Sequence, residues 1–311
     1  MTNWNVISAC RNRTMGFAII LIMLYHLGYA DILNIGVDIF LLLSGMGGAY
    51  SLKKNNDIML FYKKRIVRIL PEFLMVSIPV SLIYMLIDHK SVLETIVMAS
   101  GLSVFFNHSF AFWFIPLILI CYLITPLLFH ILSKSTKSKI LMLVSLCMLC
   151  YILAFFTDKA FIVFIRIPVF VMGMLISPSI AECSSINKTK FIMMSLISII
   201  GIAISQYLIN TGCEWSYVFI SYTIYILPLT LCLSTILNSI KFRFLPYLGA
   251  ITLELYLLHE SLCIRFANLV LHEVSGFAKL LMCTILSVAL AIMLSKVLQS
   301  INDKTVQKLW N

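Results

Sequence analysis

The sequence predicts an all-α, polytopic membrane protein with about ten transmembrane helices and both termini on the cytoplasmic side. Of its 311 residues, 61% are hydrophobic and only 12% are charged. The mean hydropathy is +1.02, which lies outside the usual range of soluble domains. Apolar runs long enough to cross a hydrocarbon core of about 30 Å recur along the whole chain. No small-residue cleavage site follows the first run, so a signal peptide is not predicted.

Polar connectors divide the apolar runs into ten predicted spans. In order, the spans cover residues 15–30, 33–51, 66–87, 110–132, 139–156, 160–177, 190–209, 215–238, 247–270 and 277–300. The connector 88–109 is itself largely apolar, and it contains Glu94 and Gly101. We interpret it as an interfacial or re-entrant segment, with an eleventh span as the alternative. The chain 1–311 is predicted to form a single membrane domain.

The net charge of +10 is explained by topology. With a cytoplasmic N-terminus, 18 of the 23 Lys and Arg residues fall on the inner side, as the positive-inside rule requires. The outer connectors hold only Lys90, Lys159 and Lys279, while Arg166 and Arg265 lie within spans. An even number of spans preserves this alternation. A nucleic-acid partner is therefore not expected.

Nine cysteines lie mostly within apolar runs. Cys147 and Cys150 have the spacing of a metal or redox motif, but they lie inside a predicted span without a set of His or Cys partners. We interpret them as small apolar side chains, so no metal site is predicted.

Four ionisable residues are predicted to lie near the middle of the membrane. At 1.5 Å per helical residue, His26 and Arg166 are roughly 16 Å from the cytoplasmic boundary, and Asp38 and His259 about 18 Å. Ionisable groups at this depth are functional candidates by default. The alternatives are a histidine that only joins helices by hydrogen bonds and a structural ion pair between Asp38 and Arg166.

The chemistry of these four residues permits two classes of function. A neutral histidine can take a proton from a hydroxyl, and a nearby carboxylate can orient it. Proton relays and transporter sites use the same residue types.

The second span is also rich in glycine, and Gly45 and Gly48 permit close helix packing. A contact between its backbone and a ligand is the alternative reading.

A basic cluster precedes the third span. Lys64, Arg65 and Arg68 lie on its cytoplasmic side, and the two arginines, three residues apart, share a helix face. Glu72 follows one turn later and is expected to pair with Arg68. Two guanidinium groups at the membrane surface suit a phosphorylated ligand. Attraction to anionic lipid headgroups is the alternative.

Together these segments resemble the integral membrane acyltransferase family called acyltransferase 3, over nearly the whole chain. The resemblance rests on six segments in the family's order: Met15-Gly16-Phe17-Ala18 through Leu24-Tyr25-His26; Gly36-Val37-Asp38-Ile39-Phe40 through Ser44-Gly45; Phe61 with Arg65, Arg68, Ile69 and Pro71; Phe112-Trp113-Phe114 with Tyr122 and Pro126; Arg166 with Pro168, Phe170 and Gly173; and Leu248-Gly249 with Leu255-Tyr256-Leu257-Leu258-His259.

The resemblance implies transfer of an acyl group, commonly acetyl, from acyl-CoA to a hydroxyl of a surface carbohydrate. It makes His26 the expected catalytic residue, and it makes Arg65 and Arg68 the expected ligands of the CoA phosphates, with Lys64 beside them. The donor would enter from the cytoplasm and the acceptor from the outer side. Acyl-CoA is thus a co-substrate, and no permanently bound cofactor is expected.

One position departs from the family. An arginine usually stands eleven residues before the first-span histidine, and here that position is Met15. Either Arg13 reaches the same phosphate from a shifted backbone, or the donor is held differently.

Some relatives carry a soluble domain after the last span. This chain ends at Asn311, so we expect it to complete the transfer itself or to hand the acyl group to a separate extracytoplasmic protein.

The sequence therefore predicts an O-acyltransferase in a bacterial inner or plasma membrane, in contact with lipid, acyl-CoA and a carbohydrate acceptor. His26 is the expected base or nucleophile, Asp38 orients it, and Arg166 and His259 assist. The alternatives are a carrier for a small anion or a lipid-linked sugar, and an inactive sensor on the same fold.

Overall fold

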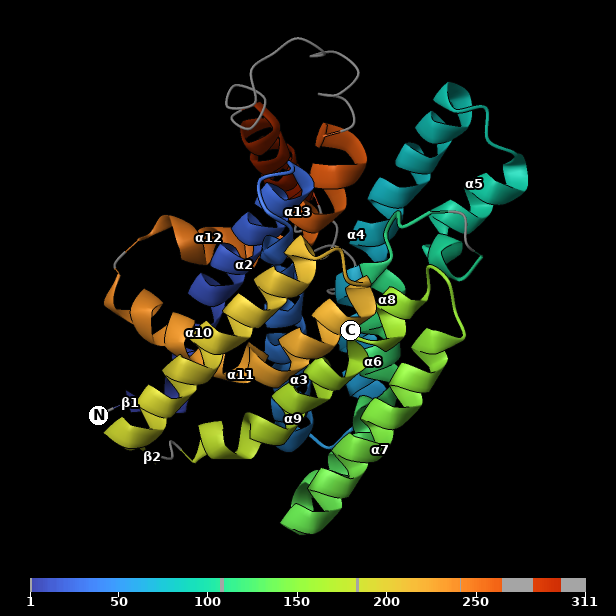
Figure 1. Cartoon of the computed structure of the whole chain (residues 1–311). Coiled ribbons are helices and arrows are strands. Elements are labelled where there is room, and N and C mark those ends of the chain that lie inside the picture. Colours follow the sequence, from blue (N-terminus) through green and yellow to red (C-terminus); the bar gives the residue numbers. More distant parts are fainter. Residues whose placement is uncertain (1, 107–108, 183–184, 241, 265–281, 298–311) are drawn as a thin grey trace. The chain divides into compact units, whose positions relative to one another are not determined.

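The computed structural model describes residues 2–106, 109–182, 185–240, 242–264 and 282–297, and these residues are mostly helical (Figure 1). Among them, seven helices are long and apolar enough to cross a membrane. They are Asp31–Lys54, Ile58–Ile87, Phe114–Leu132, Thr136–Phe155, Phe161–Pro178, Lys188–Asn210 and Trp215–Ser239. The all-α, multi-pass membrane fold is therefore confirmed. The seven helices correspond to the second to eighth predicted spans.

The three remaining predicted spans are less regular. The first corresponds to α2, Arg11–His26, whose 16 residues extend about 24 Å. The ninth is interrupted at Ile251, between α12, Phe244–Ala250, and α13, Thr252–Leu258. The tenth is described as an apolar helix over Met282–Val297. Ten spans and two cytoplasmic termini stay predictions, and residues 265–281 and 298–311 lie outside the described part.

The predicted connector 88–109 contains one short α-helix. This helix, α5, covers Val92–Ala99, so it extends only about 12 Å. It begins with a capping box, in which Ser91 accepts from the Glu94 amide and the Glu94 carboxylate accepts from the Ser91 amide. The 3₁₀ helix η2, Leu102–Phe106, follows. This segment is not among the seven candidate spans, and its interfacial or re-entrant position stays a prediction.

The chain forms two compact units, and each joins two separate stretches of sequence. Unit 1 comprises Met1–Lys63 and Phe114–Ala250, and unit 2 comprises Lys64–Trp113 and Ile251–Asn311. The prediction of a single domain stays a prediction.

Unit 1 holds most of the helices. Apart from α2 and α12, its elements are β1 Thr2–Asn3, α1 Asn5–Ala9, η1 Asp31–Ile35, α3 Gly36–Lys54, α6 Phe114–Phe129, η3 His130–Ser133, α7 Thr136–Phe155, α8 Phe161–Phe164, α9 Ile167–Ala181, β2 Ser185–Ile186, α10 Lys188–Asn210 and α11 Trp215–Ser239. The two strands pair antiparallel, Thr2 with Ile186 and Asn3 with Ser185.

Helices α3 and α9 pack backbone to backbone in unit 1 (Figure 1). A Cβ added to Gly45 would overlap the carbonyl of Phe170, and one added to Gly173 would overlap the carbonyl of Leu42. The interface therefore requires the absence of a side chain on both helices. The prediction of close packing is confirmed for Gly45, whereas a Cβ at Gly48 would meet Thr125 only at 3.4 Å.

Unit 2 is built on α4, Ile58–Ile87, from residue 64 onward. Ser77 donates to the carbonyl of Ala99 at 2.9 Å and so joins α4 to the end of α5. The rings of Phe73 and Phe112 meet edge to face, with centroids 5.6 Å apart. Helix α13 continues into the π-helix η4, His259–Ile264. The first two contacts join separate parts of the stretch 64–113.

Candidate functional site

A buried ion pair joins two of the four predicted catalytic residues. Nη1 of Arg166 lies 3.1 Å from Oδ2 of Asp38, and both side chains are at most 1% exposed. Asp38 lies in the first turn of α3, and Arg166 is the N-cap residue of α9. The glycine contacts between these two helices explain why the pair can form. One interpretation of the sequence was a structural ion pair between Asp38 and Arg166, and the structure contains this pair.

Arg166 also contacts two residues that were not predicted as site residues, Asn34 and Phe219. Its Nη2 donates to Oδ1 of Asn34 at 2.6 Å, and its guanidinium lies 4.1 Å from the ring centroid of Phe219 on α11. Asn34 precedes Asp38 by four residues, the spacing that brings helical side chains onto one face. This spacing was the feature of the sequence that could have identified Asn34 as a neighbour of Asp38. Asn34 was missed because a neutral amide does not stand out as an ionisable group does.

Arg166 is thus held from three elements. Two of the five N–H donors of its guanidinium bind Asp38 and Asn34, and the ring of Phe219 covers one face. The carboxylate of Asp38 is held through Oδ2, while its Oδ1 is buried and has no hydrogen-bond partner among the described residues. The arrangement fixes the guanidinium and leaves one carboxylate oxygen able to accept a hydrogen bond.

His26 is the last residue of α2, which packs against α3. Its side chain is half-buried. The imidazole meets the ring of Tyr25 edge to face, with centroids 4.9 Å apart. Gly28, with φ of +81°, follows in the turn that ends the helix. His26 therefore lies at a helix end in the same unit as the Asp38–Arg166 pair.

His259 belongs to unit 2, where it is completely buried at the start of η4. Its Nδ1 lies 2.8 Å from the carbonyl oxygen of Leu255. In a neutral ring this contact places the proton on Nδ1, so that Nε2 carries the lone pair. Such a tautomer is suited to accept a proton at Nε2. The predicted common depth of the four residues stays a prediction.

Arg13, the predicted phosphate ligand near the N-terminus, lies at the end of another helix. Its Nη1 donates to the carbonyls of Leu237 and Asn238, at 3.4 and 3.5 Å, in the last turn of α11. Cationic side chains stabilise helix C-termini in this way. Burial raises the pKa of the neighbouring Cys10 thiol, and Arg13 acts in the opposite direction.

A cavity of about 450 Å³ lies at this position in unit 1. Arg11, Asn12, Arg13 and Asn238 contribute polar side chains to its lining. Met15, where the family usually has an arginine, is instead 5% exposed in the core. The positive charge therefore lies nearer the start of α2 than the family pattern places it.

The other predicted phosphate ligands lie on α4 in unit 2. Lys64 and Arg68 are exposed, and Arg65 is half-buried. Arg68 interacts electrostatically with Glu72 and with Glu254 of α13. The predicted pairing of Glu72 with Arg68 stays a prediction. The electrostatic interaction of Arg68 also extends to Glu254, a second carboxylate that was not predicted.

Comparisons with known proteins give one match. No curated protein and no solved structure matches the chain. A family model described as an acyltransferase domain matches residues 16–296. This range includes all seven candidate spans, the Asp38–Arg166 pair, His26 and His259. The chain therefore belongs to the acyltransferase 3 family of membrane acyltransferases.

Proposed function

We propose that this protein is an O-acyltransferase that moves an acyl group, most often acetyl, from cytoplasmic acyl-CoA to a hydroxyl of a cell-envelope carbohydrate. The observation that carries the proposal is the family match over residues 16–296. The predicted setting is a bacterial inner or plasma membrane, with a separate extracytoplasmic acyl acceptor as a further partner.

In the proposed reaction, His26 takes the proton of the acceptor hydroxyl, and the oxygen attacks the thioester carbonyl. The tetrahedral intermediate then collapses with cleavage of the C–S bond. CoA leaves as a thiolate, which receives the proton held by His26. The half-buried ring of His26 at the end of α2 supports this role, because it combines partial burial with access.

We assign Asp38 and Arg166 positioning roles. The three contacts of Arg166 fix its charge and hold Asp38 at the start of α3. A fixed charge needs little reorganisation when negative charge develops in a transition state. We propose that this pair sets the electrostatic environment of His26, and that His259 assists proton transfer through Nε2.

For the donor, we propose that Arg13, Lys64, Arg65 and Arg68 bind the phosphates of CoA. The cavity beside Arg11 and Arg13 supports this assignment in unit 1. The exposure of Lys64 and Arg68 supports it in unit 2, because a charged ligand from the cytoplasm needs accessible donors.

Release of CoA by the purified protein in nanodiscs tests the proposal. Acetyl-CoA is supplied with bulk envelope carbohydrate, and wild type is compared with His26→Ala and with the control His130→Ala. We expect loss of a general base to slow release by about 10²–10⁴-fold, with His130→Ala unchanged. Equal rates in wild type and His26→Ala would contradict the catalytic assignment of His26 and direct attention to His259.

A carrier is the second candidate, and the interruption at Ile251 favours it, because discontinuous helices are common at transporter sites. A folded wild-type protein that releases no CoA from any short acyl-CoA, yet moves a labelled anion across vesicles, would support the carrier.

A further inference from the structure

Unit 2 contains a cavity of about 280 Å³ that none of the predicted site residues lines. Its wall is formed by the end of α4, the segment that follows it, residues 109–112, and the junction of α13 with η4. Pockets for drug-sized ligands measure about 300–1,000 Å³. This cavity therefore suits a smaller molecule, of the size of a single sugar ring.

The backbone around this cavity is unusual at three positions. In the described part of the chain, only two residues other than glycine have positive φ, His89 at 53° and Phe112 at 59°. His89 stands between the lining residues Asp88 and Lys90, and Phe112 lines the cavity itself. The third feature is the π-helix η4. A residue other than glycine in the left-handed region costs about 1–3 kcal/mol. Both such residues and π-helical turns are frequent at functional sites.

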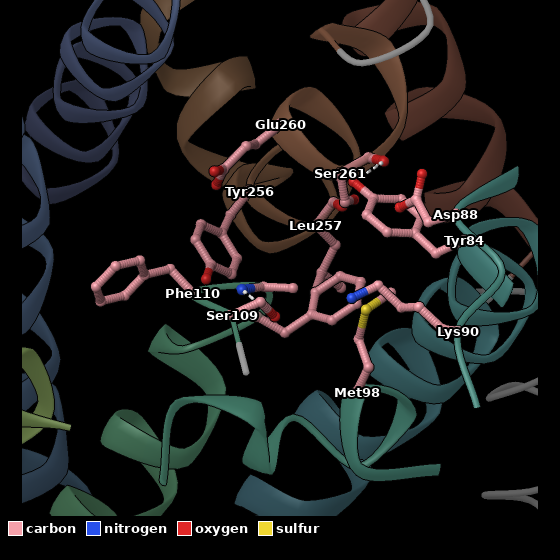
Figure 2. A pocket seen from close by; sticks show the side chains of 12 residues that line it. Tyr84, Asp88, Lys90, Met98, Ser109, Phe110, Tyr256, Leu257, Glu260 and Ser261 are labelled. Carbon is pink, nitrogen blue, oxygen red and sulfur yellow. Dashed lines mark hydrogen bonds between the residues drawn. The ribbon is translucent and has the colours of Figure 1, made fainter. Parts of the chain in front are cut away.

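The lining combines aromatic rings with charged groups. Figure 2 shows Lys90 extending toward the middle of the group, with Tyr84 and Asp88 on one side and Tyr256 on the other. Glu260 lies beyond Tyr256 (Figure 2). Carboxylates accept hydrogen bonds from hydroxyl groups, and an ammonium donates to them. Aromatic faces can cover the C–H face of a ring. This combination suits a polyhydroxylated ring.

The cavity also adjoins a candidate catalytic residue in the same unit. Tyr256 and Leu257 precede His259, and Glu260 and Ser261 follow it. Tyr84 donates to the carbonyl of Ser261 at 3.3 Å, which joins α4 to η4 beside the cavity (Figure 2). A ring bound here would therefore lie beside the helical segment that carries His259.

We infer that this cavity binds the hydroxylated ring that receives the acyl group, and that Asp88 and Lys90 determine which ring is accepted. The inference rests on the proposed function, because it assigns the acceptor of that reaction. The lining holds two carboxyl side chains, Asp88 and Glu260, and the single amine of Lys90, so a neutral ring is favoured over an acidic one.

Saturation-transfer NMR on the full-length protein in nanodiscs tests binding without requiring turnover. The probes are glucose, galactose and N-acetylglucosamine, with glucuronate as the acidic counterpart. We expect one neutral sugar to bind more tightly than glucuronate. Asp88→Asn and Lys90→Met should each weaken its Kd about two- to tenfold, the effect of losing one hydrogen bond. Asp158→Asn and Lys159→Met, in the connector between α7 and α8, are the matched controls.

Binding that the Asp88 and Lys90 variants leave unchanged, or a preference for glucuronate, would overturn the inference. Thermal melting of each variant verifies that it is folded. Measurement of CoA release on the same samples separates the two proposals. Sugar binding that depends on Lys90, without CoA release by wild type, would leave the cavity assignment standing and contradict the acyltransferase. CoA release by wild type with no sugar bound at the cavity would support the acyltransferase and contradict the cavity assignment.

Discussion

The two units use their polar residues in opposite ways. In unit 1, Arg166 binds both Asp38 and Asn34, and the backbones of α3 and α9 touch beside them. In unit 2, charged and aromatic side chains line a cavity whose backbone departs from regular helix at several points. Polar groups that bind one another inside a membrane mainly fix the structure. Polar groups that line a cavity can also contact a ligand. We therefore predict that substitutions in the Asp38–Asn34–Arg166 network affect folding and that those in the cavity lining affect binding.

The largest effect is expected at the contact between α3 and α9. Gly173→Val places a side chain where the carbonyl of Leu42 lies, so we expect loss of the folded protein. The yield of monodisperse protein in detergent measures this effect. Gly47→Ala is the control, because the nearest side-chain atom to a Cβ there, Nη2 of Arg11, is 3.8 Å away. Normal yield of Gly173→Val would mean that close packing does not hold unit 1 together.

Breaking the buried ion pair comes next. Asp38→Ala leaves the guanidinium of Arg166 without its carboxylate partner, which typically costs about 3–5 kcal/mol. Unfolding in a denaturing detergent measures the loss, and the exposed Asp31→Ala serves as control. In the double variant Asp38→Leu/Arg166→Met, both charges are removed, and we expect part of the stability to return. A double variant as unstable as the sum of the two single variants would contradict a direct pairing.

A smaller effect is expected at Asn34. Asn34→Ala removes one hydrogen bond to a charged group, and such a bond contributes about 1–2 kcal/mol within a membrane protein. The same unfolding assay measures it, with the exposed Asn55→Ala as control. If Asn34 supports Arg166, its effect should disappear in an Arg166→Met background. An unchanged effect there would place Asn34 outside the network.

The smallest effect is expected in unit 2. Tyr84→Phe removes the donor to the Ser261 carbonyl at 3.3 Å, and we expect the loss of that long hydrogen bond to cost less than about 1 kcal/mol. For this variant we expect the sugar Kd to change more, as a free energy, than the free energy of unfolding does. Thermal melting and saturation-transfer NMR on one preparation give both quantities. A loss of stability matching that of Asn34→Ala would show that the cavity wall is as structural as the unit 1 network.

Much of this fold could be predicted, because membrane spans depend on local composition. Seven predicted spans correspond to helices in the structure. The interruption at Ile251 was not predicted, because Gly249, Ala250 and Ile251 carry no charge and the preceding proline, Pro246, stands five residues earlier. Likewise, nothing local marks His89 and Phe112 for positive φ, since bulky residues normally avoid that conformation.

The candidate site was predictable only in part. Asp38 and Arg166 stand out in the sequence because charge within a span is rare. Their partners Asn34 and Phe219 do not stand out, since an amide and an aromatic ring are common in such helices. The cation–π contact of Arg166 and its hydrogen bond to the amide oxygen of Asn34 depend on how η1, α9 and α11 pack, and that information is not local to any segment.

The division of unit 2 between two stretches of sequence has a consequence for biosynthesis. Residues 64–113 leave the ribosome first, and their partner stretch begins only at Ile251. At about 5–20 residues per second, synthesis of residues 114–250 takes roughly 7–30 s. During that time Arg68 lacks the carboxylate of Glu254, and Tyr84 lacks its acceptor on Ser261. Residues 64–113 therefore stay in the bilayer without these contacts until the C-terminal stretch is made. Membrane chaperones and quality-control proteases can act on them during this interval.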